Sequence, residues 1–390
     1  SANTRHVQNA PAWPGILLSE HWTRNLKVSA PNNGRPTVSS KTIPHNLDSL
    51  TRPGDLVKKL DGENLICTAC GHLCKLRPGQ RGVCKVRFNS EGTLMVPFRY
   101  SAGLQNDPIE KKPFFHALPG SLALSFGMLG CDFHCAYCQN WFTSQSLKDE
   151  ASTVRATRVT AGEICDQAQQ QGSKVVVSTY NEPLITSEWA VEVFQEAKSR
   201  GLGTAYVSNG HGTPEVLEYL RPWMDLFKID LKSFSEKEYR RLGGNLSAVL
   251  ETIQSVYATG IWLELVTLLV PGYNDSDKEM AEIAEFIAGI SPAIPWHVTA
   301  YHPDYKMQDR GRTPVDTLLR ATRHGKEAGL QFVYSGNLPG QVKNTENTYC
   351  PHCQQLLVER KGFRVLSVHL KGESCPSCNV PVPGRWIKSF

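Results

Sequence analysis

The sequence has little charge imbalance and no long apolar run, and each absence argues against a class of protein. Its 390 residues include 42 Lys and Arg and 37 Asp and Glu, a formal net charge of +5. So small an excess, without a long basic run, argues against nucleic acid as a partner. No apolar stretch approaches the roughly 18 residues of a membrane-spanning helix, so we expect no membrane association.

The N-terminal residues also lack the charged-then-apolar layout of a secretory signal. We therefore expect a cytoplasmic protein, in which thiols stay reduced and cysteines bind metals instead of forming disulfides. Of the twelve cysteines, only Cys165 stands alone, and its helical surroundings predict a small buried apolar residue. The other eleven form an N-terminal group (Cys67, Cys70, Cys74 and Cys84), a central group (Cys131, Cys135 and Cys138) and a C-terminal group (Cys350, Cys353, Cys375 and Cys378).

The central group has the spacing C-x3-C-x2-C, with Tyr137 directly before the last cysteine. Three thiolates on one short loop can ligate three irons of a 4Fe-4S cubane, which leaves the fourth iron open to bind a small molecule. The alternatives are three buried cysteines or a zinc knuckle that lacks one ligand. The group follows a predicted strand, and the placement of the chain's other motifs after the neighbouring strands favours the cluster.

The two outer groups predict further metal sites. Two C-x2-C pairs separated by 21 residues form the C-terminal group, and this spacing favours tetrahedral zinc over an auxiliary iron–sulfur cluster. The N-terminal group, C-x2-C-x3-C-x9-C, is less diagnostic. Zinc and a closed 4Fe-4S cluster both remain possible there, with zinc slightly favoured and His72 as a spare ligand.

Composition and patterning predict four regions. Residues 1–60 are an irregular N-terminal extension, 61–105 a Cys-rich metal module, 106–342 a barrel and 343–390 a zinc-ribbon-like module. Short apolar runs within the third region predict buried parallel strands at 122–126, 175–178, 204–207, 226–229, 263–270, 297–300 and 331–334. Amphipathic stretches between them predict helices at 160–171, 187–200, 214–221, 247–259, 276–289 and 314–328.

This alternation predicts an α/β fold with right-handed crossovers. About six strand–helix units fall short of an eight-fold barrel, so we expect a partial (β/α)6 TIM-like barrel. Two helix starts are marked by a capping residue followed by proline, at Thr213-Pro214 and Thr313-Pro314.

Polar residues follow several of the predicted strands, at the edge where barrel active sites form. Glu182 follows the second strand, and its alternative role is to cap a helix before Pro183. Ser208 and Asn209 end the third strand. His302 follows the sixth, where a structural role is equally open.

The fourth strand carries Lys228, Asp230 and Lys232, which alternation places on the same side. Charged side chains on one side of a buried strand are costly unless they serve a polar interior. The alternative is that only the end of the strand is solvated.

Longer stretches resemble one family. They are Cys67-Thr68-Ala69-Cys70-Gly71-His72-Leu73-Cys74, Gly79-Gln80-Arg81-Gly82-Val83-Cys84, Asp107-Pro108-Ile109-Glu110-Lys111-Lys112-Pro113, Phe115-His116, Leu118-Pro119-Gly120-Ser121, Cys138-Gln139-Asn140-Trp141, Thr179-Tyr180-Asn181-Glu182-Pro183 and His302-Pro303-Asp304-Tyr305-Lys306-Met307. Over about residues 64–390 the chain resembles the radical S-adenosylmethionine (SAM) enzymes of the AmmeMemoRadiSam system, relatives of the pyruvate formate-lyase activating enzymes.

The resemblance implies a 4Fe-4S cluster on the central group, reduced by flavodoxin or ferredoxin, that cleaves SAM to a 5′-deoxyadenosyl radical. It implies that SAM is contacted near Tyr137, Glu182, Ser208, Asn209, Asp230 and His302. Activating enzymes carry an acidic residue, linked to a monovalent cation, just before the Thr-Asn-Gly of the third strand. Val207 stands there in this sequence, which puts such a cation site in doubt. For residues 107–121 we expect a loop that packs near the cluster.

The sequence thus predicts a radical SAM enzyme that abstracts hydrogen from an unidentified substrate, which is a small molecule or a protein. One alternative is an activase that generates a glycyl radical on a partner protein. The other is a metal-bearing module that binds RNA or protein, in which the cluster is structural.

Overall fold

A computed structural model describes residues 47–150, 152 and 154–387, which all belong to one compact unit. Its centre is an eight-stranded sheet in the order β16-β15-β14-β13-β12-β11-β9-β8. Each neighbouring pair from β9 to β16 is parallel, and β8 is antiparallel to β9. Because β8 and β16 are the two ends of this sheet, the barrel is partial, as the sequence predicted.

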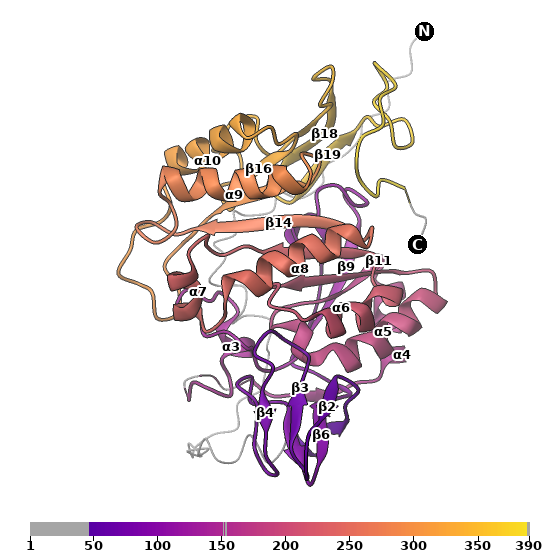
Figure 1. Ribbon diagram of the computed structural model, residues 1–390. Helices are drawn as coiled ribbons and strands as arrows, with labels where there is room; N and C mark the ends of the chain where they lie inside the picture. The colour runs from indigo at the N-terminus through magenta and orange to yellow at the C-terminus, as the bar shows by residue number, and fades with distance from the viewer. Residues whose placement is uncertain (1–46, 151, 153, 388–390) are drawn as a thin grey trace, which may run out of the picture. The chain divides into compact units, whose positions relative to one another are not determined.

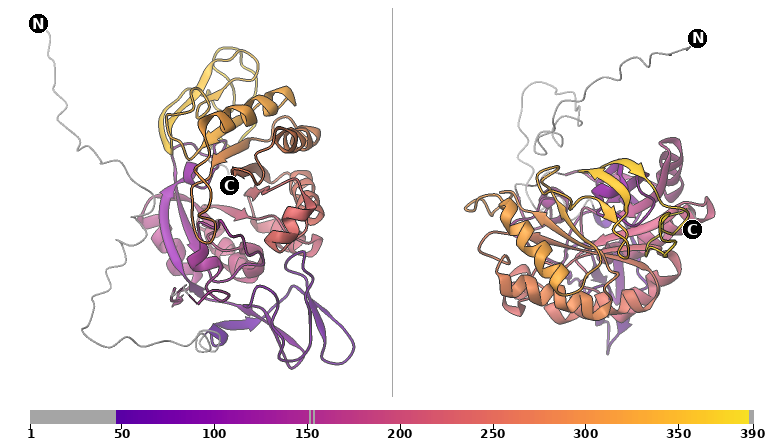
Figure 2. Two further views of the ribbon diagram at one scale, coloured as in Figure 1. Left: turned by 90° about the vertical axis from the view of Figure 1, so that its left-hand side faces the viewer. Right: turned by 90° about the horizontal axis from the view of Figure 1, so that it is seen from above.

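Except for β8 and α7, which were not predicted, the strands and helices of the barrel lie close to the predicted ranges. The strands are β8 (Gly103–Pro108), β9 (Leu122–Gly127), β11 (Ser173–Ser178), β12 (Gly203–Ser208), β13 (Leu226–Asp230), β14 (Trp262–Leu269), β15 (Trp296–Ala300) and β16 (Val333–Gly336). The helices are α4 (Ala161–Gln170), α5 (Ser187–Ser199), α6 (Pro214–Leu220), α7 (Glu236–Leu242), α8 (Leu246–Ala258), α9 (Asp277–Ile290) and α10 (Val315–Glu327). Figures 1 and 2 show these helices on the outer face of the curved sheet. The predicted (β/α)6 arrangement is confirmed; the last predicted strand, at 331–334, is β16 at one end of the sheet, and the unpredicted β8 is at the other end.

Strand alternation divides the buried side chains between two cores. Phe126 of β9 and Val176 of β11 belong to the large core under the helices. Ala123 and Val177 face the other way, into a smaller core inside the barrel. Because adjacent side chains of a strand point to opposite faces, these apolar strands are buried on both sides.

Capping side chains begin most of these helices, but one of the two predicted starts is wrong. The Thr213 hydroxyl accepts a hydrogen bond from the Val216 amide and caps α6 as predicted. Thr313 does not cap α10. Its hydroxyl donates to the carbonyl of Leu269 and accepts from the amide of Tyr301, so it joins two loops at the carboxyl ends of β14 and β15.

The N-terminal module begins earlier than the sequence predicted. Residues 51–59 were expected to be irregular, yet they form two strands of the module, while residues 1–46 lie outside the described part of the chain. One sheet consists of β1 (Thr51–Pro53), β6 (Thr93–Pro97) and β5 (Phe88–Ser90). The other consists of β2 (Val57–Lys59), β3 (Leu65–Cys67) and β4 (Lys75–Leu76).

The sequence predicted that residues 107–121 pack near the cluster. This prediction is wrong, because the segment lies at the opposite end of the barrel. Phe114 belongs to the core inside the barrel, and the amides of Phe115 and His116 donate to the Glu264 carboxylate near the amino end of β14. Charged and proline-rich composition does not specify which end of a barrel a loop covers, because both ends contain polar groups.

The C-terminal module packs against this same end. It contains a sheet of β17 (Thr348–Tyr349), β18 (Leu356–Lys361) and β19 (Arg364–Val368). His116 contacts the carbonyl of Pro383 and the hydroxyl of Tyr334, and Arg360 donates to the carbonyl of Phe115. In the part of the chain that the structure describes, no helix is both long and apolar enough to span a membrane.

Candidate active site and metal centres

The cluster loop, residues 128–140, follows the carboxyl end of β9 and is held from several sides. The amide of Gly130 donates to the carbonyl of Thr143, and the Lys148 ammonium donates to the carbonyl of Cys131 at 2.6 Å. The amides of Lys306 and Met307 both donate to the carbonyl of Ala136. Through these contacts the backbone of the His302–Met307 stretch supports the loop that carries the cysteines.

A row of charges from β13 lies beside the central group. The ammonium groups of Lys228 and Lys232 both contact the carboxylate of Asp230, with Lys232 at 3.1 Å. Burial acts to raise the pKa of Asp230, but the two lysines outweigh it and lower this pKa to about 2. Burial raises the pKa of Cys135 to about 12, and the nearby Lys232 opposes that shift. The predicted polar interior is therefore present, and the solvated-end alternative does not hold for Lys228, which is only 4% exposed.

Glu182, Ser208 and Asn209 form one hydrogen-bonded network at the carboxyl ends of β11 and β12. The Glu182 carboxylate accepts from the Ser208 hydroxyl at 2.6 Å, the Asn209 amide at 2.7 Å and the Leu184 amide at 3.0 Å. Burial and the nearby Asp132 raise the pKa of Glu182 to about 8. The Leu184 contact caps a short 3-10 helix, η2 (Pro183–Thr186), so the capping alternative is realised. A carboxylate has about four lone-pair sites, so about one remains on Glu182, and a ligand ammonium bound there would favour the ionised form over the protonated one.

Asp132 joins this network to the N-terminal module. Its carboxylate accepts from the Asn209 side-chain amide at 2.8 Å and from His211 Nδ1 at 2.9 Å. Burial acts to raise the pKa of Asp132, but the hydrogen bonds that its carboxylate accepts from His211 and Asn209 favour the ionised form and the pKa is lowered. His211 also packs edge-to-face on His72, whose Nε2 contacts the carbonyl of Asp132. Sequence reasoning missed Asp132 and His211, although each lies within two residues of a residue that it singled out.

The remaining predicted SAM contacts lie on the loops around the barrel mouth. Tyr137 is buried and packs edge-to-face on Tyr273, from the turn after β14. His302 Nε2 lies 3.1 Å from the side-chain amide nitrogen of Gln139, directly after the last cysteine of the cluster loop. These contacts place Tyr137 and His302 beside the central group, and their roles toward SAM stay predictions.

The C-terminal group has the geometry of a four-sulfur metal site. Its four sulfurs lie within 4.8 Å of one another, and the Cys350–Cys378 and Cys353–Cys375 pairs are each 3.6 Å apart. A tetrahedron with Zn–S bonds of about 2.3 Å has edges of about 3.8 Å. Burial acts to raise the pKa of Cys375, but hydrogen bonds from the backbone N–H groups of Cys378 and Ser377 outweigh it and lower this pKa. The lower pKa favours a thiolate at Cys375.

The N-terminal group is buried against the barrel. Cys67, Cys70 and Cys84 are each at most 6% exposed, and Cys74 is partly exposed. Each of the other three thiols is close enough to Cys67 to interact electrostatically with it. Cys165 is fully buried in the large core, where its sulfur also approaches the carbonyl of Val193, as predicted for a small buried residue.

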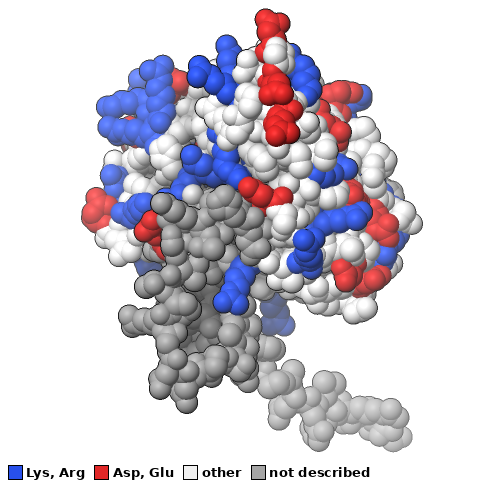
Figure 3. Space-filling view, turned by 90° about the horizontal axis from the view of Figure 1, so that it is seen from below, with Lys and Arg blue, Asp and Glu red and all other residues white. Residues whose placement is uncertain are grey.

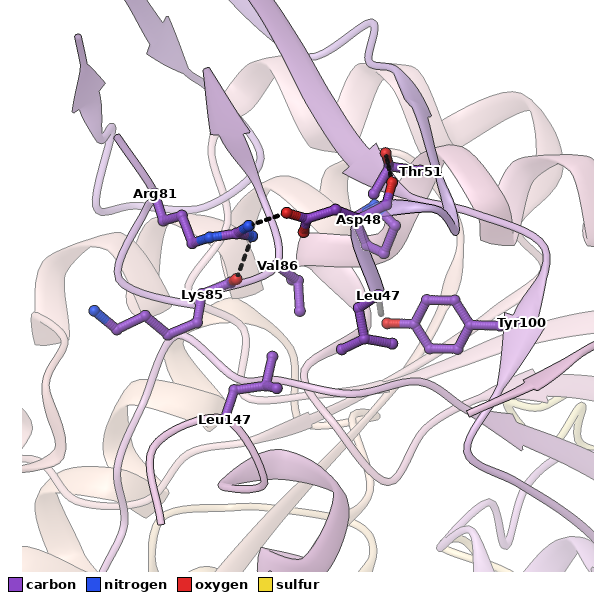
Figure 4. Close-up of a pocket in the computed structure, with 9 residues that line it drawn as sticks. Leu47, Asp48, Thr51, Arg81, Lys85, Val86, Tyr100 and Leu147 are labelled. Atoms are coloured by element: carbon purple, nitrogen blue, oxygen red, sulfur yellow. Dashed lines mark hydrogen bonds and ion pairs between the residues drawn. The ribbon is translucent and has the colours of Figure 1, made fainter. Parts of the chain in front are cut away.

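Two cavities of the described structure lie away from the barrel mouth. One is bordered by Asp48, Arg81, Tyr100 and Leu147 (Figure 4), and its volume of about 10 Å³ is room for about one water. The other, of about 380 Å³, lies between Arg221, Gly260 and Arg385, at the end of the barrel that the C-terminal module covers. Neither cavity is formed by residues of the cluster loop.

Comparison with known proteins identifies the family. Residues 127–287 match the model of the radical SAM superfamily. An uncharacterized protein of Methanocaldococcus jannaschii is 34% identical over 325 residues, which cover 82% of this chain and 96% of that protein. The chain belongs to the radical SAM superfamily.

Other relatives of this radical SAM protein are more distant. The pyruvate formate-lyase-activating enzyme of Streptococcus mutans is 24% identical over 47% of this chain and 73% of its own length. A radical SAM methyltransferase from Sphaerobacter thermophilus aligns over 82% of this chain and 86% of its own, with 16% identity and a TM-score of 0.45.

Membership makes the protein an enzyme and implies a 4Fe-4S cluster and SAM. The residues present fit both groups. Three cysteines lie on one loop at the barrel mouth, where Lys148 and Lys232 supply positive charge beside them. Sequence reasoning placed Lys232 in the polar row of the fourth strand but gave it no part in the site; its closeness to the cysteines appears only in the structure.

Proposed function

We propose that the central group binds the 4Fe-4S cluster and that the protein cleaves SAM reductively to abstract hydrogen from an unidentified substrate. When bound, the cluster supplies the electron that produces the 5′-deoxyadenosyl radical. This proposal is supported by one grouping at the mouth of the barrel. The three cysteines, with Lys148 and Lys232 beside them, lie near the Glu182 network at the carboxyl ends of consecutive parallel strands. Barrel active sites form at that end.

The chain's own residues bind and orient SAM in this proposal. Glu182 has room for one further hydrogen bond, which suits the SAM amino group. Asp230 holds the Lys232 ammonium beside Cys135, where it is suited to bind the carboxylate of SAM. Tyr137, Ser208 and Asn209 are buried near this position and would help to exclude water from a reactive radical, and the half-buried His302 lies at its rim.

The test is SAM cleavage by protein that is purified anaerobically and loaded with iron and sulfide. With dithionite as reductant, we expect the wild type to form 5′-deoxyadenosine. The variant with Cys131, Cys135 and Cys138 all changed to Ala should form none and should lose about four irons per chain. Cys165→Ala is the matched control, a buried cysteine outside the three groups. Equal product from wild type and triple variant would refute the proposal.

A second candidate function is the activation of a glycyl-radical protein, which is favoured by the names of the activating-enzyme relatives. Its distinguishing result is a glycine-centred EPR signal on a partner polypeptide after incubation with SAM and reductant. For the C-terminal group we propose zinc, on the sulfur spacing described above. For the reductant we propose flavodoxin or ferredoxin.

A further inference from the structure

We propose that the N-terminal group binds a second 4Fe-4S cluster, which passes electrons from a low-potential electron-transfer protein to the central group. This inference rests on the proposed function, because it needs a redox-active cluster at the central group. It departs from the zinc site that the sequence slightly favoured. The reasons are the spacing of the sulfurs, their surroundings and their position.

The sulfur spacing separates the three groups into two kinds. Only two sets of three or more metal-binding side chains have all their ligand atoms within 4.8 Å among the described residues. One set is the whole C-terminal group, as zinc requires. Neither the central group nor the N-terminal group forms such a set by itself. A cubane has an iron at each corner with its thiolate outside, so its sulfurs stand farther apart than those around zinc. By this measure the N-terminal group resembles the central one.

The other close set, Cys70 with Asp132 and His211, does not suit a mononuclear metal. The side-chain oxygen of Asn245 accepts from the amide of Ala248, so its NH2 group faces His211 Nε2 at 3.0 Å. That contact makes Nε2 the acceptor and puts the proton on Nδ1, which donates to Asp132. The His211 lone pair is therefore occupied, and Cys70 is left for the N-terminal group.

The surroundings of the N-terminal group suit a buried anionic cluster. The Arg87 guanidinium is 1% exposed and donates through Nε to the sulfur of Cys67 at 3.1 Å. Its other nitrogens are held by Glu188 and the carbonyl of Ile185. An arginine fixed in this way supplies a hydrogen bond and positive charge to a sulfur ligand, two factors that set the potential of iron–sulfur clusters.

The N-terminal and central groups are nearly in contact. One carboxylate lies between them: Asp132 Oδ1 is 3.7 Å from the sulfur of Cys131, and an Asp132 oxygen lies within 4.8 Å of the sulfur of Cys70. The loops also touch, because a Cβ added to Gly130 would lie 2.8 Å from the carbonyl oxygen of Cys84. Electrons that reach the N-terminal group therefore have a short path to the central one.

The outer side of the N-terminal group is suited to contact an electron donor. Cys74 is the most accessible cysteine of the N-terminal group, because the other three are buried. The adjacent Leu73 is an apolar side chain that is 45% exposed. Val83, next to Cys84, is 40% exposed. Lys75 and Lys85 are exposed beside them. Figure 3 views the side on which this module lies and shows lysine and arginine side chains interspersed with aspartate and glutamate. The exposed Lys75 and Lys85, next to the apolar Leu73 and Val83, suit contact with an acidic electron-transfer protein.

The electron count balances without a further reactant. The donor protein loses one electron, which reduces the N-terminal cluster from the 2+ to the 1+ state. Transfer to the central cluster restores the N-terminal cluster to 2+, and the electron is then available for SAM cleavage. No bond is made or broken at the N-terminal group.

Metal analysis tests the site itself. We expect wild-type protein, loaded anaerobically with iron and sulfide, to contain about eight irons and one zinc per chain. Cys67→Ala/Cys70→Ala and the milder Cys74→Ser should each lose about four irons and keep zinc, which also reports an intact fold. Cys165→Ala should lose neither. If the N-terminal variants lose one zinc and no iron, the proposal is overturned even though SAM cleavage by the wild type would still support the proposed function.

EPR and reduction kinetics test the relay. The dithionite-reduced wild type should show two clusters whose signals are broadened by magnetic interaction, and Cys67→Ala/Cys70→Ala should show the central signal alone and unbroadened. Reduced flavodoxin or ferredoxin should reduce the central cluster of this variant at least tenfold more slowly, while dithionite reduces it equally well in both proteins. Equal rates with the protein donor would overturn the relay.

Discussion

Arg87 shows how one buried side chain links the N-terminal module to the barrel. Its guanidinium makes two hydrogen bonds of 2.7 Å to Glu188 of α5, and both side chains are at most 1% exposed. Desolvation of such a pair offsets much of its attraction, but removal of one partner leaves a buried charge without compensation.

We therefore expect Arg87→Met to lower the free energy of unfolding by about 3–5 kcal/mol. Lys58→Met is the matched control, because Lys58 pairs with Glu215 on the surface and should cost at most about 1 kcal/mol. Urea unfolding of both variants measures the difference. Similar losses in the two variants would show that the buried pair contributes no more than an exposed one.

At the scale of elements, the cluster loop is shaped by the module that packs against it. Gly130 directly precedes Cys131 and has a φ of +92°, and its α-carbon faces the carbonyl of Cys84 and the side chain of Val86. A side chain at this position has no space, and the left-handed conformation is itself unfavourable for residues with a Cβ.

We expect Gly130→Ala to separate the cluster loop from the N-terminal module and to lower the iron content of both groups by at least half. Gly79→Ala is the matched control, since Gly79 has a φ of +76° but no atom within 4 Å of an added Cβ. It should keep its iron, so iron analysis of the two variants isolates the steric effect from the backbone strain. Full iron loading of Gly130→Ala would contradict the close packing described here.

At the scale of the whole molecule, the C-terminal module closes the barrel at the end opposite the cluster loop. Its Arg360 contacts the carbonyl of Phe115, and its Pro383 carbonyl accepts from His116.

We expect Cys353→Ser to lose the proposed zinc and to lower the thermal unfolding midpoint, because a structural metal contributes to folding directly. Iron content should be unchanged, since the cluster loop lies at the other end. Zinc analysis and calorimetry check both, and retention of zinc would contradict a four-sulfur site.

Acid should weaken the contact between the C-terminal module and the barrel at His116. Burial lowers the pKa of His116 from 6.5 to about 4, so the unfolded chain takes up a proton that the folded protein refuses. This contribution to stability is present above pH 6.5 and is lost as the pH falls toward 4, by at most about 3 kcal/mol. We expect His116→Gln to show a smaller loss of urea-unfolding free energy between pH 7 and pH 5 than the wild type. Equal losses would assign the acid sensitivity to other groups.

The amino-acid sequence alone determined the order of the barrel's elements and the family. Seven apolar runs became the seven parallel strands, and the spacing of the central group indicated radical SAM chemistry, because both features depend on residues close together in the chain. Helix starts were less certain: Thr213 caps a helix and Thr313 does not, because tertiary partners claimed the Thr313 hydroxyl.

Only the tertiary structure decided which distant residues meet. It brought Asp132 and His211 together across the barrel mouth and placed them next to Cys70. It moved residues 107–121 to the opposite end and began the N-terminal module at residue 51 instead of 61. Periodicity and spacing are properties of neighbouring residues, whereas these contacts depend on how strands and loops separated by dozens of residues pack. The low charge imbalance of the chain gave no sign that its buried charges would be paired so closely.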